Sequence, residues 1–140
     1  MRAALPELLR TLAATGGAVL VAPPGTGKTT LVPLALAGLL PVPGAPAPPG
    51  GRVVVAEPRR VAARAAARRM AALLGEDVGA RVGYAVRGER ARSAATVVEV
   101  VTTGLLLRRL QHDPELAGTT AVVLDEVHER SLDADLALAF

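Results

Sequence analysis

The stretch Gly17–Thr30, GAVLVAPPGTGKTT, constrains the fold of this chain more than any other part of the sequence. Residues 18–21 form an apolar run with the character of a buried strand, and residues 31–40 form an apolar segment of helical length. A turn rich in proline and glycine lies between them. This order of strand, glycine-rich loop and helix is the setting in which backbone N–H groups at a helix N-terminus bind phosphate. The sequence therefore predicts a phosphate-binding loop.

The residue types of this loop suit a nucleoside triphosphate. Lys28 can reach the β- and γ-phosphates, and the Thr29 hydroxyl can ligate Mg²⁺. We therefore expect a magnesium-bound nucleotide here, with Lys28 as a catalytic residue and Thr29 as a metal ligand. The predicted nucleotide contacts are Pro24, Gly25, Thr26, Gly27, Lys28, Thr29 and Thr30.

One position of the loop departs from the pattern G-x-x-x-x-G-K-[ST], because Ala22 stands where the pattern has glycine. The alternative interpretation is a glycine-rich loop that only connects a strand to a helix. The chain holds 16 lysines and arginines, and Lys28 is its only lysine. A slim point charge suits this place better than a planar guanidinium, so the composition favours phosphate binding.

Composition bounds what else the chain can be. Its 140 residues make at most one domain, and with 1% aromatic residues the core must be built from alanine, valine and leucine. The absence of cysteine excludes disulfides and thiolate metal sites. Residues 1–14 lack the pattern of a secretory signal, and no apolar stretch has the length to span a bilayer. We expect a cytoplasmic protein.

Charge is unevenly distributed along the chain. Residues 52–92 hold ten arginines and four acidic residues, whereas residues 110–140 hold one arginine and seven acidic residues. A basic segment suits a polyanionic partner, and an acidic one suits a metal-binding or solvated face. Arg60, Arg64 and Arg68 share one helix face, which predicts either phosphate contacts or a solvated basic face.

The rest of the sequence predicts strands that alternate with helices. Strands are expected at residues 52–56, 81–86, 96–101 and 120–124. Helices are expected at residues 2–15, from about 61 to about 74, from the end of the segment 102–104 to about 111, and from about 131 onward. Residues 41–51, with five prolines and three glycines, and residues 88–93 are expected to be loops. The pattern indicates an α/β fold with a mostly parallel sheet and helices on both faces. Functional residues should then lie at the carboxyl ends of the strands.

Acidic residues follow the last predicted strand. Asp125 comes directly after it and could hold Mg²⁺, while Glu126 could orient or deprotonate an attacking water. The alternative interpretation is that both residues form a solvated turn. The presence of a phosphate-binding loop in the same chain favours the metal and water roles over that interpretation. His128 lies two residues further on, and its spacing alone assigns it no role.

Several segments, taken together, resemble the first RecA-like domain of DEAH-box superfamily 2 helicases, in their bacterial HrpB-like branch. In chain order they are APPGTGKTT at 22–30, EPRRVAA at 57–63, VGY at 82–84, TTG at 102–104 and DEVHERSLDAD at 125–135. The sequence departs from the family's name-giving motif only at Val127, where that motif has alanine. The resemblance covers nearly the whole chain.

The resemblance implies a P-loop NTPase that uses ATP and Mg²⁺ and acts on nucleic acid, most simply single-stranded RNA. It implies that Glu126 positions the attacking water and that His128 links the nucleotide state to a second RecA-like domain. It also implies that Arg69 stacks on adenine. The implied contacts to the nucleic-acid backbone are Arg59, Arg60, Thr102 and Thr103.

The same resemblance implies that residues 1–140 form an incomplete first motor domain, because in the family this part of the chain is followed by a Ser-Ala-Thr motif and then by a second RecA-like domain that carries arginine fingers. We therefore expect this chain alone to be inactive as a helicase. Two alternatives stay open at this point. One is a catalytically inactive nucleic-acid-binding remnant, and the other is a P-loop kinase or small-molecule NTPase.

Overall fold

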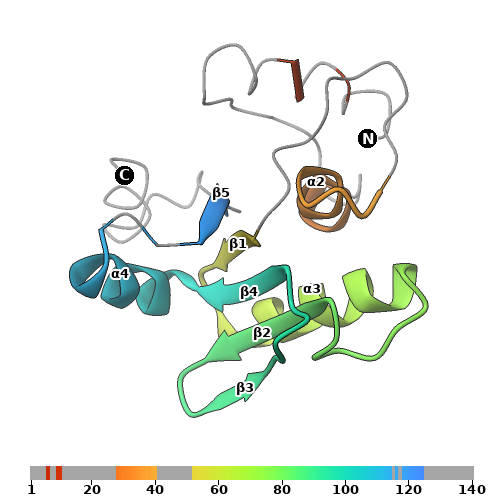
Figure 1. Ribbon diagram of the computed structural model, residues 1–140. Coiled ribbons are helices and arrows are strands. Elements are labelled where there is room, and N and C mark those ends of the chain that lie inside the picture. Colours follow the sequence, from red (N-terminus) through yellow and green to blue (C-terminus); the bar gives the residue numbers. More distant parts are fainter. Residues whose placement is uncertain are drawn as a thin grey trace.

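The computed structural model describes residues 6, 9–10, 28–40, 52–114, 116 and 118–124 (Figure 1). Strands and helices follow one another along these residues. The helices are α2 (Lys28–Leu36), α3 (Arg60–Leu73) and α4 (Thr103–His112). The strands are β1 (Arg52–Glu57), β2 (Val82–Val86), β3 (Glu89–Ala91), β4 (Val98–Thr102) and β5 (Thr119–Leu124).

The strands form one sheet in the order β3-β2-β4-β1-β5. Strand β1 pairs in parallel with β4 on one side and with β5 on the other, and β2 pairs in parallel with β4. Among the strands that the structure describes, only β3 runs antiparallel, beside β2. The mostly parallel sheet predicted from the sequence is therefore confirmed.

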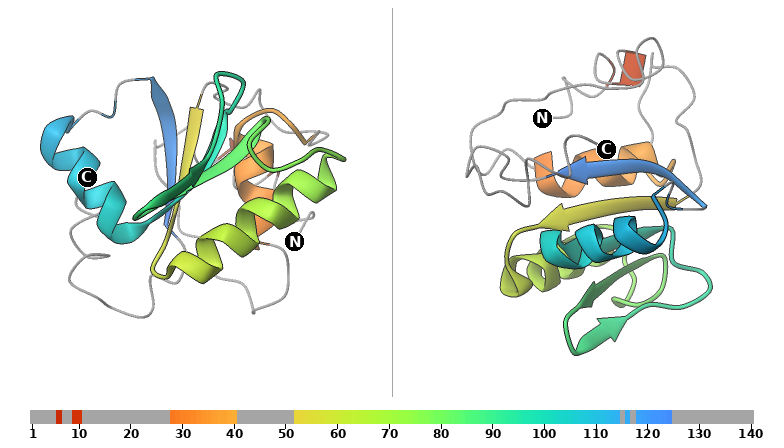
Figure 2. Two further views of the ribbon diagram at one scale, coloured as in Figure 1. Left: turned by 90° about the horizontal axis from the view of Figure 1, so that it is seen from below. Right: turned by 90° about the vertical axis from the view of Figure 1, so that its left-hand side faces the viewer.

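Helices cover both faces of this sheet, as predicted (Figure 2). Because side chains alternate along a strand, Val53 and Val55 pack with α2 and α3, whereas Val54 and Ala56 pack with α4. Helix α3 lies close to the sheet because the side chains of its buried face are mostly alanines. Its buried residues are Ala63, Ala66, Ala67, Met70 and Ala71.

Most predicted elements are confirmed within two residues. Helix α3 ends before Gly75, whose φ of +70° is the left-handed conformation that commonly terminates a helix. Helix α2 (Lys28–Leu36), however, begins three residues before and ends four residues before the predicted segment 31–40.

The expectation of a loop at residues 88–93 is wrong. Glu89–Ala91 forms β3, which pairs with β2 in a hairpin that turns at Arg87 and Gly88. Gly88 has a φ of +81°, which glycine adopts without strain. The run of charges concealed this strand because it lies at the edge of the sheet, where charged side chains reach water and discourage further pairing.

Other predicted segments lie outside the described residues. They are the strand at 18–21, the loop at 41–51 and the helix from 131 onward. Of the helix predicted at 2–15, only Pro6, Leu9 and Arg10 are described. All three are helical, and Leu9 is buried in the core cluster that also contains residues of α2 and α3.

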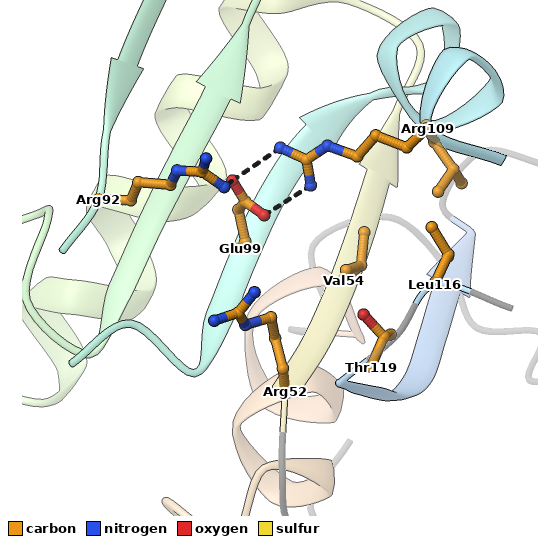
Figure 3. Close-up of a pocket in the computed structure, with 8 residues that line it drawn as sticks. Arg52, Val54, Arg92, Glu99, Arg109, Leu116 and Thr119 are labelled. Atoms are coloured by element: carbon orange, nitrogen blue, oxygen red, sulfur yellow. Dashed lines mark hydrogen bonds and ion pairs between the residues drawn. The ribbon is translucent and has the colours of Figure 1, made fainter. Parts of the chain in front are cut away.

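The α4 face of the sheet contains a buried carboxylate. Glu99 on β4 is 2% exposed, and its Oε1 accepts a hydrogen bond from Arg109 Nη1 at 2.7 Å (Figure 3). Its Oε2 accepts from Arg109 Nη2 and from Arg92 Nη1, both at 3.0 Å. Burial alone would raise the pKa of Glu99, but the hydrogen bonds and charges of the two arginines outweigh it and hold the pKa below its usual value.

We predict that Arg109→Ala destabilises the fold by about 3 kcal/mol at pH 7, because it leaves a buried charge with only one partner. In the parent, the lowered pKa of Glu99 contributes stability that is present above the unfolded pKa and lost as pH falls. In the variant, burial dominates and raises that pKa, so protonation near pH 4 relieves part of the damage. The loss measured by urea unfolding should therefore be smaller at pH 4 than at pH 7.

The matched control is Arg108→Ala, which removes an exposed arginine from the same helix. It should change the free energy of unfolding by less than about 0.5 kcal/mol. An equal loss at pH 4 and pH 7 for Arg109→Ala would show that Glu99 does not depend on Arg109 for its charge.

Candidate nucleotide and nucleic-acid site

The carboxyl ends of the three neighbouring parallel strands β4, β1 and β5 meet at one end of the sheet. The register pairs Glu57 of β1 with Thr102 of β4, and Ala56 of β1 with Leu124 of β5. The segments that follow these strands therefore begin side by side. The structure brings together, at this edge, the predicted arginine pair, the predicted threonine pair and the end of the strand that precedes Asp125.

Arg59 and Arg60 lie where β1 leads into α3. Arg59 is the N-cap residue of α3, with extended φ and ψ of −125° and 143° and no capping hydrogen bond from its side chain. Both arginine side chains are exposed. The start of a 14-residue helix adds its partial positive charge to theirs, so this corner favours an anion.

Thr102 and Thr103 occupy the equivalent place between β4 and α4. Thr102 is the N-cap of α4, and its hydroxyl accepts a hydrogen bond from the backbone N–H of Leu105 at 3.4 Å. Thr103 is 8% exposed. These threonines thus shape the start of α4, and any anion here would meet the first N–H groups of the helix more easily than the Thr103 side chain.

Helix α2 begins at Lys28, so Lys28, Thr29 and Thr30 form its first turn, as a phosphate-binding loop requires. The predicted contacts Pro24, Gly25, Thr26 and Gly27 lie outside the described residues, as do Asp125, Glu126 and His128. Within the described part of the chain, no group of three or more metal-ligating side chains is present.

The three arginines that share one face of α3, Arg60, Arg64 and Arg68, are not all available to a polyanion. Arg64 Nη1 donates a hydrogen bond to Glu89 Oε2 at 2.8 Å, which ties α3 to the edge strand β3. The Tyr84 hydroxyl donates to the other oxygen of the same carboxylate. For Arg64 the interpretation as a phosphate contact is therefore replaced by a structural ion pair, whereas Arg60 and Arg68 are exposed.

Sequence reasoning did not single out Glu89 or the role of Tyr84. The hydrogen bond from Tyr84 and then that from Arg64 lower the pKa of Glu89. The same hydrogen bond, with burial, raises the pKa of Tyr84. The one sequence feature that could have indicated this pair is that the single tyrosine of the chain lies close to the charged residues 87–92.

Arg69 lies apart from this row. It is nine positions after Arg60, or about two and a half helical turns, which places it on the opposite flank of α3. The row that includes Arg64 is on the side of β3, and α2 packs beside α3 on the side of β1. Arg69 is exposed. Its flank is therefore the one nearer α2, where the predicted nucleotide loop ends.

We predict that Tyr84→Phe raises the pKa of Glu89 toward its ordinary value, because the hydroxyl hydrogen bond is the largest cause of the lowering. Titration of the glutamate carboxyl carbons by NMR measures this midpoint. The lowered pKa means that the pair contributes stability above the unfolded pKa and loses it as pH falls, so Tyr84→Phe should also flatten the acid side of the stability profile.

Arg90→Ala is the control, because Arg90 is an exposed arginine on the same short strand. That variant should leave the Glu89 midpoint in place. If Tyr84→Phe left the midpoint unmoved as well, the hydroxyl would not be a partner of Glu89 in solution.

The fold and this edge define an α/β domain with a mostly parallel sheet, whose exposed arginine pair lies where β1 leads into α3. The family model of the DEAD/DEAH box helicases matches residues 2–135. The chain belongs to this family. Within the described residues, no helix is both long enough and apolar enough to cross a membrane.

Individual relatives agree with this assignment. The chain is 50% identical, over 98% of its length, to the ATP-dependent RNA helicase HrpB of Escherichia coli, and 39% identical to the ATP-dependent RNA helicase DHX33 of Drosophila melanogaster over 93%. It matches a crystal structure of the E. coli DEAH/RHA helicase HrpB with a TM-score of 0.85 over 98% of this chain and 17% of that one. The chain spans 16% of the HrpB relative and 18% of the DHX33 relative.

Proposed function

We propose that residues 1–140 form the first RecA-like domain of an ATP-dependent DEAH-box helicase, which binds Mg²⁺-ATP and single-stranded RNA. One observation carries this proposal. The parallel strands β1, β4 and β5 end at one edge, where the arginine pair, the threonine pair and the segment beginning at Asp125 follow them. Family membership supports this function over a small-molecule kinase.

On the nucleotide side, each proposed role follows from residue type and place. The first turn of α2 would present backbone N–H groups and Lys28 to the phosphates, and Thr29 with Asp125 would hold Mg²⁺. The ion would neutralise charge on the phosphate oxygens. Glu126 would orient the attacking water, and His128 would report the nucleotide state to a second domain.

On the nucleic-acid side, the proposed contacts are sequence-blind. Arg59 and Arg60 would bind phosphates at the start of α3, and Thr102 and Thr103 would place the start of α4 against the next stretch of backbone. Base stacking would contribute little, since the chain has one tyrosine, one phenylalanine and no tryptophan. ATP turnover in the complete protein would then be coupled to translocation or unwinding. We place the protein in the cytoplasm.

Lys28→Ala should abolish Mg²⁺-ATP binding and leave the fold intact, because the side chain would contact ligand and not the core. Titration with a fluorescent ATP analogue measures the affinity, and circular dichroism checks the fold. Arg108→Ala removes the same charge from α4 and should bind nucleotide as the parent does. Unchanged affinity in Lys28→Ala would reject the assignment of the loop.

Arg59→Ala combined with Arg60→Ala should weaken the binding of single-stranded RNA about equally for different sequences. It should also flatten the dependence of log K on log salt by roughly one per lost phosphate contact. Arg52→Ala combined with Arg108→Ala removes equal charge away from this edge and serves as the control. Equal losses in both double variants would mean that net charge, and not this surface, drives binding.

A further inference from the structure

A pocket lies on the α4 face of the sheet, at the opposite end of the strands from the proposed RNA and nucleotide site. It has a volume of about 190 Å³ and opens between β1, β4, β5 and α4 (Figure 3). Arg52 and Thr119, the first residues of β1 and β5, mark its position at the amino end. Its lining residues are Arg52, Val54, Arg92, Glu99, Leu106, Arg109, Leu116 and Thr119.

The polar wall of this pocket carries an excess of positive charge, because three arginines face a single glutamate. Both carboxylate oxygens of Glu99 accept hydrogen bonds from Arg92 and Arg109, so this negative charge holds the two guanidinium groups in place. Each guanidinium has five N–H donors, and the three bonds to Glu99 leave most of them available. Glu99 thus presents two ordered cations to the pocket.

Arg52 adds a third cation to the pocket. Within the described part of the chain, the ion pairs join Arg64, Arg81, Arg92 and Arg109 to glutamates and do not include Arg52. The Arg52 side chain extends into the same opening (Figure 3). The side chains of Arg92 and Arg109 are 37% and 27% exposed, so all three guanidinium groups can meet a ligand from solvent. A planar fork of this kind binds carboxylate and phosphate oxygens with two parallel hydrogen bonds.

The remaining wall is apolar. Val54 of β1, Leu106 of α4 and Leu116 are buried residues of one core cluster, and they line the pocket beside the arginines. A bound molecule would therefore place an anionic head among the guanidinium groups and a short hydrocarbon stem against these three side chains. A volume of about 190 Å³ lies below the range of about 300–1,000 Å³ typical of drug-sized ligands, so the pocket suits a small molecule.

We propose that this pocket binds a small organic acid, whose carboxylate or phosphate head is held by Arg52, Arg92 and Arg109. The site is separate from the proposed nucleotide and RNA surfaces, because it lies toward the amino ends of the strands and those surfaces lie at the carboxyl ends. Its ligand would contact β1, β4 and β5, the three strands that carry the proposed functional segments, and would bridge them to α4.

The test uses the 140-residue chain labelled with nitrogen-15 and titrated with butyrate, butyl phosphate and inorganic phosphate at constant ionic strength. We expect butyrate or butyl phosphate to shift the backbone signals of Glu99, Leu116 and Thr119 in a saturable manner. Stronger binding of butyrate identifies a carboxylate ligand, and stronger binding of butyl phosphate identifies a phosphate monoester. Inorganic phosphate should bind more weakly than butyl phosphate because it lacks the stem.

Three variants make the result specific. Arg52→Ala should weaken binding about tenfold or more, the effect of losing one charge-assisted contact, without breaking the bonds to Glu99. Arg87→Ala, at the turn beyond β2, and Lys28→Ala, at the phosphate loop, should leave the pocket's response unchanged. Equal binding by Arg52→Ala and Arg87→Ala, or shifts that chloride reproduces at the same ionic strength, would overturn the proposal.

Discussion

The parallel pairing of β1 with β4 and β5 is the constraint on which the rest of this structure depends. Backbone hydrogen bonds on both edges of β1 fix which residues lie opposite each other, and the register leaves no freedom in where the neighbouring strands end. Because all three run in the same direction, their carboxyl ends share one edge. Segments separated by more than sixty residues thereby begin next to each other, and the proposed site is a consequence of that pairing.

The small side chains of the core let the helices follow this sheet closely. Alanines make up most of the buried face of α3, and valines dominate the strands beneath it. With so few large residues, the contact depends on close approach more than on the filling of space by bulky groups. This packing fixes the direction of α3, and with it which flank carries Arg60 and Arg64 and which carries Arg69.

Arginine serves at least two physical purposes in this chain. Some arginines are held by carboxylates: Arg64 by Glu89, Arg81 by Glu76, and both Arg92 and Arg109 by Glu99. Others, such as Arg60, Arg68 and Arg69, are exposed on α3. A basic segment is therefore a poor measure of how much surface can bind nucleic acid, because part of its charge is used to join elements of the fold.

The sequence by itself determined the order of the described elements apart from β3, the mostly parallel sheet and the motifs that place the chain in the DEAD/DEAH box helicase family. These features depend on local patterns, namely apolar runs, glycines and polar residues at strand ends. Each such pattern is visible within a single stretch of the chain. Only the tertiary structure decided that residues 89–91 form an edge strand, that Arg64 is bound to Glu89, and that Glu99 anchors two arginines beside a pocket. Each of these depends on partners from different elements. Their proximity is set by strand order and register, which local sequence patterns do not specify.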